Sequence, residues 1–290
     1  MDVPTEQSTR APAAIARAYL EPSALDAVVR QKVPVSLLRL GFETRGLTAC
    51  IGTLTLNECA QPILVDEGEV ARSLFGIIRD LRPRFLAAPS DLYEQEIRML
   101  RGGIPVDPHP NVEQEEIERN EVDELADGRI SPWFLELVQD RRKTKLDAWQ
   151  PHWIAYLEEV KKLRQLPAKM PHLGSFQQVE AFFRPDLARF IGGLLGPKIS
   201  AEGARLMAAT IDRYPAIHTS VYYFWNAMSI CLVNGCAPSK DKVDDYRHIV
   251  EASYCDVFIS NDSQLLSSIS RFHPTLAPLD VGAFIRSISS

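Results

Sequence analysis

The stretch KVDDYRHIVEASYCDVFISNDSQLL, residues 242–266, contains two helical patterns with a short apolar run between them. Residues 244–253 have the spacing of a helix, residues 256–260 (DVFIS) are typical of a strand, and residues 263–270 again have helical spacing. Acidic residues stand near the start of the first helix, and another acid, Asp262, follows the strand after one intervening residue. The stretch therefore predicts a strand–helix unit with acids beside it.

The N-terminal part repeats this alternation. Residues 18–20 (AYL) form a short apolar run before the helical pattern PSALDAVVRQ, and residues 47–51 (LTACI) favour a second strand. Thr53 is a plausible N-cap of the next helix, which Pro62 should end. At the C-terminus, residues 275–279 favour a last strand before a closing helix, DVGAFIRSI. Strands alternating with helices at both ends of the chain predict an α/β core.

Between these ends, residues 65–233 show almost only helical patterns. Ser131 with Pro132, and Ser175 with Gln178, are typical of helix starts. We therefore expect a discontinuous α/β core over residues 13–65 and 236–290. A large all-helical insertion over residues 66–235 would interrupt it, and residues 1–12 would form a flexible arm.

The charge of the chain is unevenly distributed. The 290 residues carry a formal net charge of −6, but residues 107–127 contain nine acids and one base, a net of −8. The rest of the chain is at +2, so its composition permits a nucleic-acid partner without requiring one. Within residues 107–127, the acidic segment of residues 112–127 (VEQEEIERNEVDELAD) is most simply explained as a solvated helix, with a mobile segment, a partner-binding surface or a nucleic-acid mimic as alternatives. A basic cluster, either a solvated face or an RNA contact, consists of Arg141, Arg142, Lys143 and Lys145.

Several acids share one local context, close behind a predicted strand or near a helix start. They are Glu21, Glu58, Asp244, Asp245 and Asp262. In open α/β sheets the carboxyl ends of the strands meet along one edge, so these acids can converge. Converged carboxylates stay ionised together when a cation lies between them, and oxygen ligands without thiolates or a His pair favour Mg²⁺ or Mn²⁺. Each acid also has a structural alternative: Asp244 as an N-cap, Glu58 as a solvated residue, Asp262 in a turn.

Three segments together resemble the PIN-domain (PilT N-terminus-like) nuclease family. They are YLEPSALDAV, IGTLTLNECA and the stretch of residues 242–266. The resemblance implies a three-layer α/β core with a short parallel sheet and the activity of a metal-dependent nuclease, most readily an endoribonuclease. It also implies that Glu21, Glu58, Asp245 and Asp262 are catalytic metal ligands, with Asp244 as the alternative to Asp245. Ser23, Ser260 and Asn261 match the polar positions that line the pocket. The implied partners are an RNA or DNA substrate and an inhibitor or antitoxin protein.

Glu21 stands where the family usually has Asp, and the interval from Glu58 to Asp245 is longer than the family's usual spacer. A catalytically weak or inactive PIN-like scaffold, binding a protein or RNA through its helical insertion, is therefore the alternative. His248 lies one helical turn from both candidate aspartates, so it either assists at the pocket or serves the core.

Other classes of function lack their motifs. The sequence contains no GxGxxG, Walker A or GxSxG pattern and no HExxH. Five cysteines without a CxxC predict reduced thiols in a cytoplasmic protein rather than a disulfide framework. No N-terminal secretory signal is visible, and the longest apolar stretch is too short for a bilayer, so we expect no membrane partner.

Overall fold

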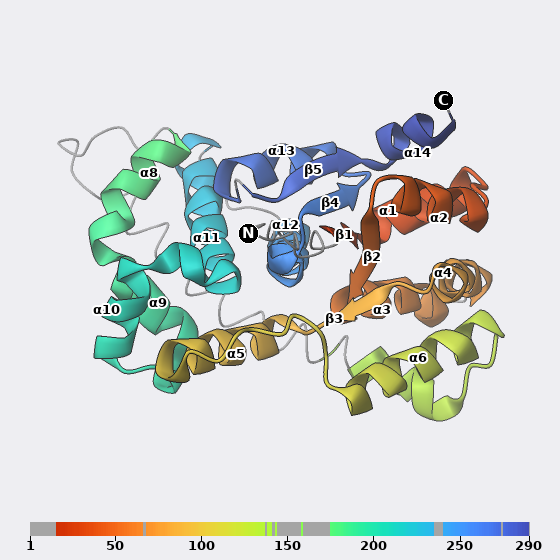
Figure 1. Cartoon of the computed structure of the whole chain (residues 1–290), viewed down its shortest axis with the longest axis horizontal. Coiled ribbons are helices and arrows are strands. Elements are labelled where there is room, and N and C mark those ends of the chain that lie inside the picture. The colour runs from red at the N-terminus through yellow and green to blue at the C-terminus, as the bar shows by residue number, and fades with distance from the viewer. Residues whose placement is uncertain are drawn as a thin grey trace, which may run out of the picture.

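A five-stranded parallel sheet lies at the centre of the computed structural model, which describes residues 16–65, 68–136, 138–140, 175–234, 240–273 and 275–289, together with residues 143 and 158. The strand order is β3-β2-β1-β4-β5 (Figure 1). The strands are β1 (Ala16–Leu20), β2 (Leu47–Gly52), β3 (Arg84–Leu86), β4 (Val257–Ser260) and β5 (Ala277–Asp280). Tyr19 of the central β1 is in register with Cys50 of β2 and with Phe258 of β4.

Helices connect the strands and cover both faces of the sheet. On the N-terminal side they are α1 (Pro22–Arg30), α2 (Val35–Thr44), α3 (Thr53–Ala60), α4 (Gly68–Leu81), α5 (Pro89–Gly102) and α6 (Val112–Ala126). Further along they are α8 (Phe176–Phe183), α9 (Leu187–Leu195), α10 (Ala201–Ala209), α11 (Pro215–Asn234), α12 (Lys240–Glu251), α13 (Ser263–Phe272) and α14 (Val281–Ser289). Short 3-10 helices are η1 (Gln61–Val65), η2 (Arg184–Asp186), η3 (Gly196–Lys198), η4 (Ile211–Arg213) and η5 (Ala252–Tyr254).

Successive residues of a strand point to opposite faces, and the buried side chains of the sheet divide accordingly. Ala18 and Leu20 of β1 belong to the cluster beneath α1, α2, α4 and α14. Tyr19 belongs to a second cluster on the opposite face, together with residues of α11, α12 and α13. Figure 1 shows these two helical layers on either side of the sheet. Three layers follow, as expected for a parallel sheet buried on both faces.

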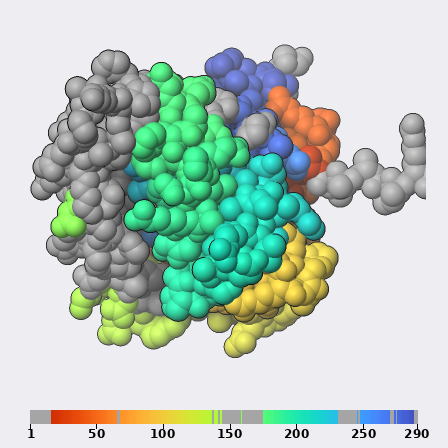
Figure 2. Space-filling model, turned by 90° about the vertical axis from the view of Figure 1, so that its left-hand side faces the viewer, coloured from red at the N-terminus to blue at the C-terminus, as the bar shows by residue number. Residues whose placement is uncertain are grey.

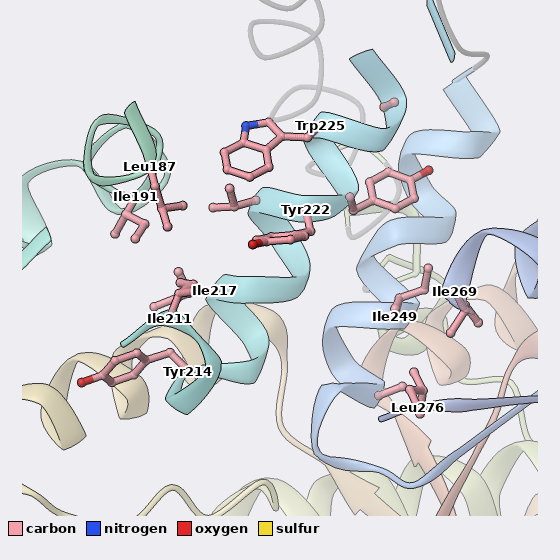
Figure 3. Packing of buried hydrophobic residues seen from close by; sticks show 14 of the residues in the cluster. Leu187, Ile191, Ile211, Tyr214, Ile217, Tyr222, Trp225, Ile249, Ile269 and Leu276 are labelled. Atoms are coloured by element: carbon pink, nitrogen blue, oxygen red, sulfur yellow. The ribbon is translucent and has the colours of Figure 1, made fainter. Parts of the chain in front are cut away.

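A group of helices extends the second layer away from the sheet. The residues of α8, α9 and α10 occupy much of the front of the view in Figure 2. Helices α8 and α9 pack against α11, and α10 packs against α9. In α11, Trp225 is fully buried, and the ring centroids of Trp225 and Tyr222 lie 5.0 Å apart. Figure 3 shows α11 with Leu187 and Ile191 of α9 on one side and Ile249 and Ile269 of α12 and α13 on the other. The buried helix α11 therefore packs between the outer helices α8 and α9 and the helices α12 and α13 that cover the sheet, and all of them share one hydrophobic core.

The α/β class and the parallel sheet predicted from the sequence are confirmed, but two expectations are wrong. The insertion is not all-helical, because residues 84–86 form β3 and pair with β2. Three residues are too short to produce a recognisable period-2 pattern. The helix expected from Asp244 already includes Lys240, so Asp244 lies inside it and is not its N-cap.

The structure also bears on four smaller predictions, which concern the start of α3, the acidic segment, the N-terminal arm and membrane-spanning helices. Thr53 is the first residue of α3 and Gly52 its N-cap, one position earlier than expected. The acidic segment forms α6, one face of which is buried through Val122 and Leu125. The predicted arm, residues 1–12, lies outside the described residues. None of the helices described is long and apolar enough to span a bilayer.

Candidate functional site

The carboxyl ends of three adjacent strands bring predicted acids to one edge of the sheet. Glu21 directly follows the central β1, and Asp262 follows β4, which is hydrogen-bonded to β1 on one side. Glu58 lies on α3, the helix that follows β2 on the other side. Because the strands are parallel, the three acids share the edge at which ligands bind in open α/β sheets.

Glu21 is held in place by hydrogen bonds that all fall on one of its oxygens. It is the N-cap of α1, and Oε2 accepts from the backbone N–H of Ser23 at 3.0 Å and from the Ser23 hydroxyl. The hydroxyl of Ser260 donates to the same Oε2 at 3.0 Å. Glu21 is only 8% exposed, so these bonds replace much of its hydration. Among the described residues none donates a hydrogen bond to Oε1, which remains available to a ligand.

The turn after β4 is tied to the same cluster. The backbone N–H of Asn261 donates to the Ser23 hydroxyl oxygen at 3.0 Å, and that of Asp262 donates to Ser260 Oγ at 2.9 Å. Asp262 is the N-cap of α13, and its Oδ1 accepts from the backbone N–H groups of Gln264 and Leu265 at 2.8 and 3.0 Å. Its structural role is thus real, but within the described chain only Oδ1 is used in it.

Asp245 of α12 completes the acidic group. Burial raises its pKa to about 7, and so does repulsion from Asp262, Glu21 and Glu58, while His248 acts in the opposite direction. Each of the other three acids is therefore close enough to Asp245 to act on its charge. A carboxylate among like charges is stabilised by a proton or by a cation.

Behind the acids lies a buried polar network that begins at Glu58. Oε2 of Glu58 lies 3.2 Å from Nε2 of His248, an ion-pair distance. Nδ1 of His248 lies 2.7 Å from the hydroxyl oxygen of Tyr19, and this hydroxyl donates to Oε2 of Glu251 at 2.9 Å. His248 is 2% exposed, and Tyr19 and Glu251 are completely buried. The network thus connects the core of the sheet to the acidic edge.

The charges of this network follow from its burial. Burial acts to lower the pKa of His248, but the carboxylates of Glu58, Glu251 and Glu21 outweigh it, so the pKa is raised. Burial raises the pKa of Glu251 to about 7, although a backbone N–H and the Tyr19 hydroxyl donate to its carboxylate. The hydroxyl of Tyr19 has one proton, so while it donates to Glu251 it accepts from Nδ1 of His248.

The structure brings some of the predicted site residues together, whereas others are not described. Glu21, Glu58 and Asp262 each act on the charge of Asp245. Ser23 contacts Ser260 and the backbone of Asn261. The side chain of Asp244 is not described. Of the predicted basic cluster, Lys143 is exposed, while Arg141, Arg142 and Lys145 lie outside the described residues.

The roles of Tyr19, Thr55 and Glu251 were not predicted from the sequence, because these residues do not belong to a recognisable motif. Tyr19 stands in an apolar strand, where it is typical of core packing, and Thr55, 3.0 Å from the Tyr19 hydroxyl, stands in an apolar helix turn. Glu251 is three residues from His248 on α12, which places both on one helical face. That spacing is the one signal in the sequence that could have associated the two.

The acids offer the ligands that Mg²⁺ or Mn²⁺ prefers, but not a preassembled metal site. Carboxylate oxygens from four segments, with no thiolate among them, suit a hard divalent cation. In the part of the chain that the structure describes, however, no three His, Cys, Asp or Glu side chains stand close enough together to hold a metal ion. The donor set therefore fits such a cation by its chemistry, and binding would require side-chain rotation.

Comparisons with known proteins add no assignment to this geometry: no family model, curated protein or solved structure matches the chain significantly.

Proposed function

We propose that this edge of the sheet binds Mg²⁺ or Mn²⁺ and hydrolyses phosphodiester bonds in the manner of a PIN-like endonuclease. RNA is the preferred substrate in this proposal, and DNA is the alternative. The observation that carries the proposal is the placement of four carboxylates from distant segments at one edge of the sheet, where burial first and repulsion among the carboxylates second raise the pKa of Asp245 to about 7. Such mutual repulsion costs stability, and a protein retains it most readily where a cation relieves it.

The residues have separable roles in this proposal. Glu21, Glu58, Asp245 and Asp262 would hold the cation, and Asp244 is the alternative to Asp245. When bound, the cation would lower the pKa of a water molecule and stabilise the charge that develops on the phosphate. The hydroxyls of Ser23 and Ser260 hold Oε2 of Glu21, whereas Oε1 accepts no hydrogen bond from the described residues. The preference for RNA rests on the family resemblance of the sequence.

A cleavage assay on single-stranded and structured RNA and DNA, with Mg²⁺ or Mn²⁺, tests the proposal. The sharpest variant is Asp262→Asn, because Asn caps a helix as well as Asp and the substitution removes only the charge. We expect the cleavage rate of Asp262→Asn to be lower than that of the wild type by about 100-fold or more. This is the scale of loss seen when a group that stabilises transition-state charge is removed. Glu202→Gln is the matched control, since it neutralises an exposed acid of α10, paired with Arg205.

A second function, a non-catalytic scaffold with the same fold, is favoured by a different observation. Oε2 of Glu21 and Oδ1 of Asp262 are both used in internal hydrogen bonds, as capping residues of purely structural helices are. The same assay separates the two functions. Cleavage that EDTA abolishes supports the nuclease. Cleavage that survives both EDTA and Asp262→Asn contradicts it, and absence of cleavage on every substrate favours the scaffold.

A further inference from the structure

Helix α12 contacts α3 at two points, and both contacts belong to the buried polar network. On α12, Glu251 and His248 are three residues apart and so face the same side. Oε1 of Glu251 accepts from the backbone N–H of Leu54 at 3.1 Å, in the first turn of α3. His248 lies 3.2 Å from the carboxylate of Glu58, one helical turn further along α3. The pair therefore fixes both the start of α3 and the side chain of its acid.

Tyr19 holds the two residues of α12 in this arrangement. Its hydroxyl lies 2.7 Å from Nδ1 of His248 and 2.9 Å from Oε2 of Glu251, and it also lies 3.0 Å from Oγ1 of Thr55 on α3. Its ring stacks on Phe258 of β4 with centroids 5.2 Å apart. A fully buried phenol fixed by the two central strands is a rigid support for these contacts.

Gly52 shows how closely this network fits the backbone. A Cβ atom placed on Gly52, the N-cap of α3, would lie 1.9 Å from Oε2 and 2.3 Å from Cδ of Glu251. The carboxylate of Glu251 therefore lies directly against the end of β2. Only a residue without a side chain leaves room for it there.

We propose that Tyr19, His248 and Glu251 are positioning residues that fix α3 and orient the carboxylate of Glu58 toward the acidic edge. This inference rests on the proposed function for its purpose, since Glu58 is a proposed metal ligand. None of the three contacts substrate. They act through Glu58, as outer groups that orient the ligands of a metal do in general.

The testing variant is Tyr19→Phe, which keeps the stacked ring and removes only the hydroxyl. Tyr254→Phe is its matched control, because the Tyr254 hydroxyl likewise donates to a buried carboxylate, that of Glu96, at 2.7 Å. Binding of Mn²⁺ to the full chain is measured by calorimetry, and unfolding by denaturant gives the loss of stability. We expect Tyr19→Phe to weaken Mn²⁺ binding roughly tenfold or more, and Tyr254→Phe to leave it unchanged at a similar loss of stability.

Two further variants separate positioning from folding. His248→Leu removes the contact to Glu58, whereas His248→Gln can restore a donor there, so Mn²⁺ affinity should be lower in the first than in the second. If Tyr19→Phe and the control bind Mn²⁺ as tightly as the wild type does, the three residues serve stability alone and the inference is overturned.

A failure of the proposed function would be seen separately, as absence of Mn²⁺ binding to the wild-type chain. Crystal structures of the wild type, Tyr19→Phe and His248→Leu then decide the inference without a metal. A Glu58 carboxylate displaced in both variants supports positioning. A carboxylate that stays in its wild-type place in both overturns it.

Discussion

The hydroxyl of Ser260 donates a 3.0 Å hydrogen bond to Oε2 of Glu21, and it thereby joins the end of β4 to the end of β1 across 239 positions of sequence. The same Ser260 oxygen accepts from the backbone N–H of Asp262 at 2.9 Å. Two of the four site acids are thus linked through one buried hydroxyl. Their spacing is set by the parallel pairing of two neighbouring strands.

Asp262 has a capping role and a proposed catalytic role, and substitution separates them. Asp262→Ala removes the acceptor of the N–H groups of Gln264 and Leu265, so the free energy of unfolding should fall by about 1 kcal/mol. Asp262→Asn keeps an acceptor and should cost much less. Denaturant unfolding measures both. Equal losses in the two variants would contradict the capping role.

Gly52 should tolerate no side chain. In Gly52→Ala the new methyl group would overlap the buried carboxylate of Glu251, so we expect a loss of about 1–3 kcal/mol in the free energy of unfolding. Gly76→Ala, within α4, meets nothing within 4 Å and should stabilise by roughly 0.5–1 kcal/mol through helix propensity. The prediction is wrong if Gly52→Ala is as stable as the wild type.

Glu96 should make the stability of the protein depend on pH. Burial raises its pKa from 4.5 to about 7, although its carboxylate accepts from the Tyr254 hydroxyl and from the backbone N–H groups of Ala216 and Ile217. The folded state therefore holds this proton more tightly than the unfolded state does. The corresponding stability is complete below about pH 4.5 and is lost as the pH rises through about 7, at about 1.4 kcal/mol per pH unit in between.

Glu96→Gln, neutral at every pH, isolates this effect. The wild type should lose stability relative to Glu96→Gln by on the order of 3 kcal/mol between pH 4.5 and pH 8, measured by denaturant unfolding. Glu94→Gln is the control, since Glu94 is half exposed and pairs with Lys198. A difference between wild type and Glu96→Gln that does not change with pH would refute the prediction.

Trp225 should contribute to stability through packing alone. It is fully buried against α9, and its Nε1 has no hydrogen-bond partner within the described part of the chain. Trp225→Ala should lower the free energy of unfolding by about 3–5 kcal/mol, and Trp225→Phe by much less, because no hydrogen bond is lost. Trp133→Phe, at a side chain 61% exposed, should change it by less than about 0.5 kcal/mol.

The strands and helices at the two ends of the chain were predictable because their signals are local. The runs at β1, β2 and β4 have short apolar patterns, and α13 is preceded by a residue suited to capping. β3 was not predictable, since its three residues, Arg84–Leu86, become a strand only by pairing with β2. Tertiary contact, rather than local propensity, decides such a segment.

The candidate site also contains residues with a local sequence signal and residues that only tertiary contacts bring together. Glu21, Glu58 and Asp262 could be proposed because acids close behind strands are a local pattern with a known spatial consequence, and Asp245 because the segment around it resembles the PIN-domain family. The network behind them was not found, because Tyr19 and Glu251 are 232 positions apart and neither stands in a polar context. The start of α12 was also misplaced, since Asp244 has the chemistry of an N-cap but lies inside the helix.

Calorimetric titration of the full chain with Mn²⁺ tests the central claim most directly. We predict that the wild type binds Mn²⁺, that Asp245→Asn and Glu58→Gln each weaken binding by roughly tenfold or more, and that Glu202→Gln leaves it unchanged. Absence of Mn²⁺ binding by the wild type, or equal affinity in all four proteins, would contradict it.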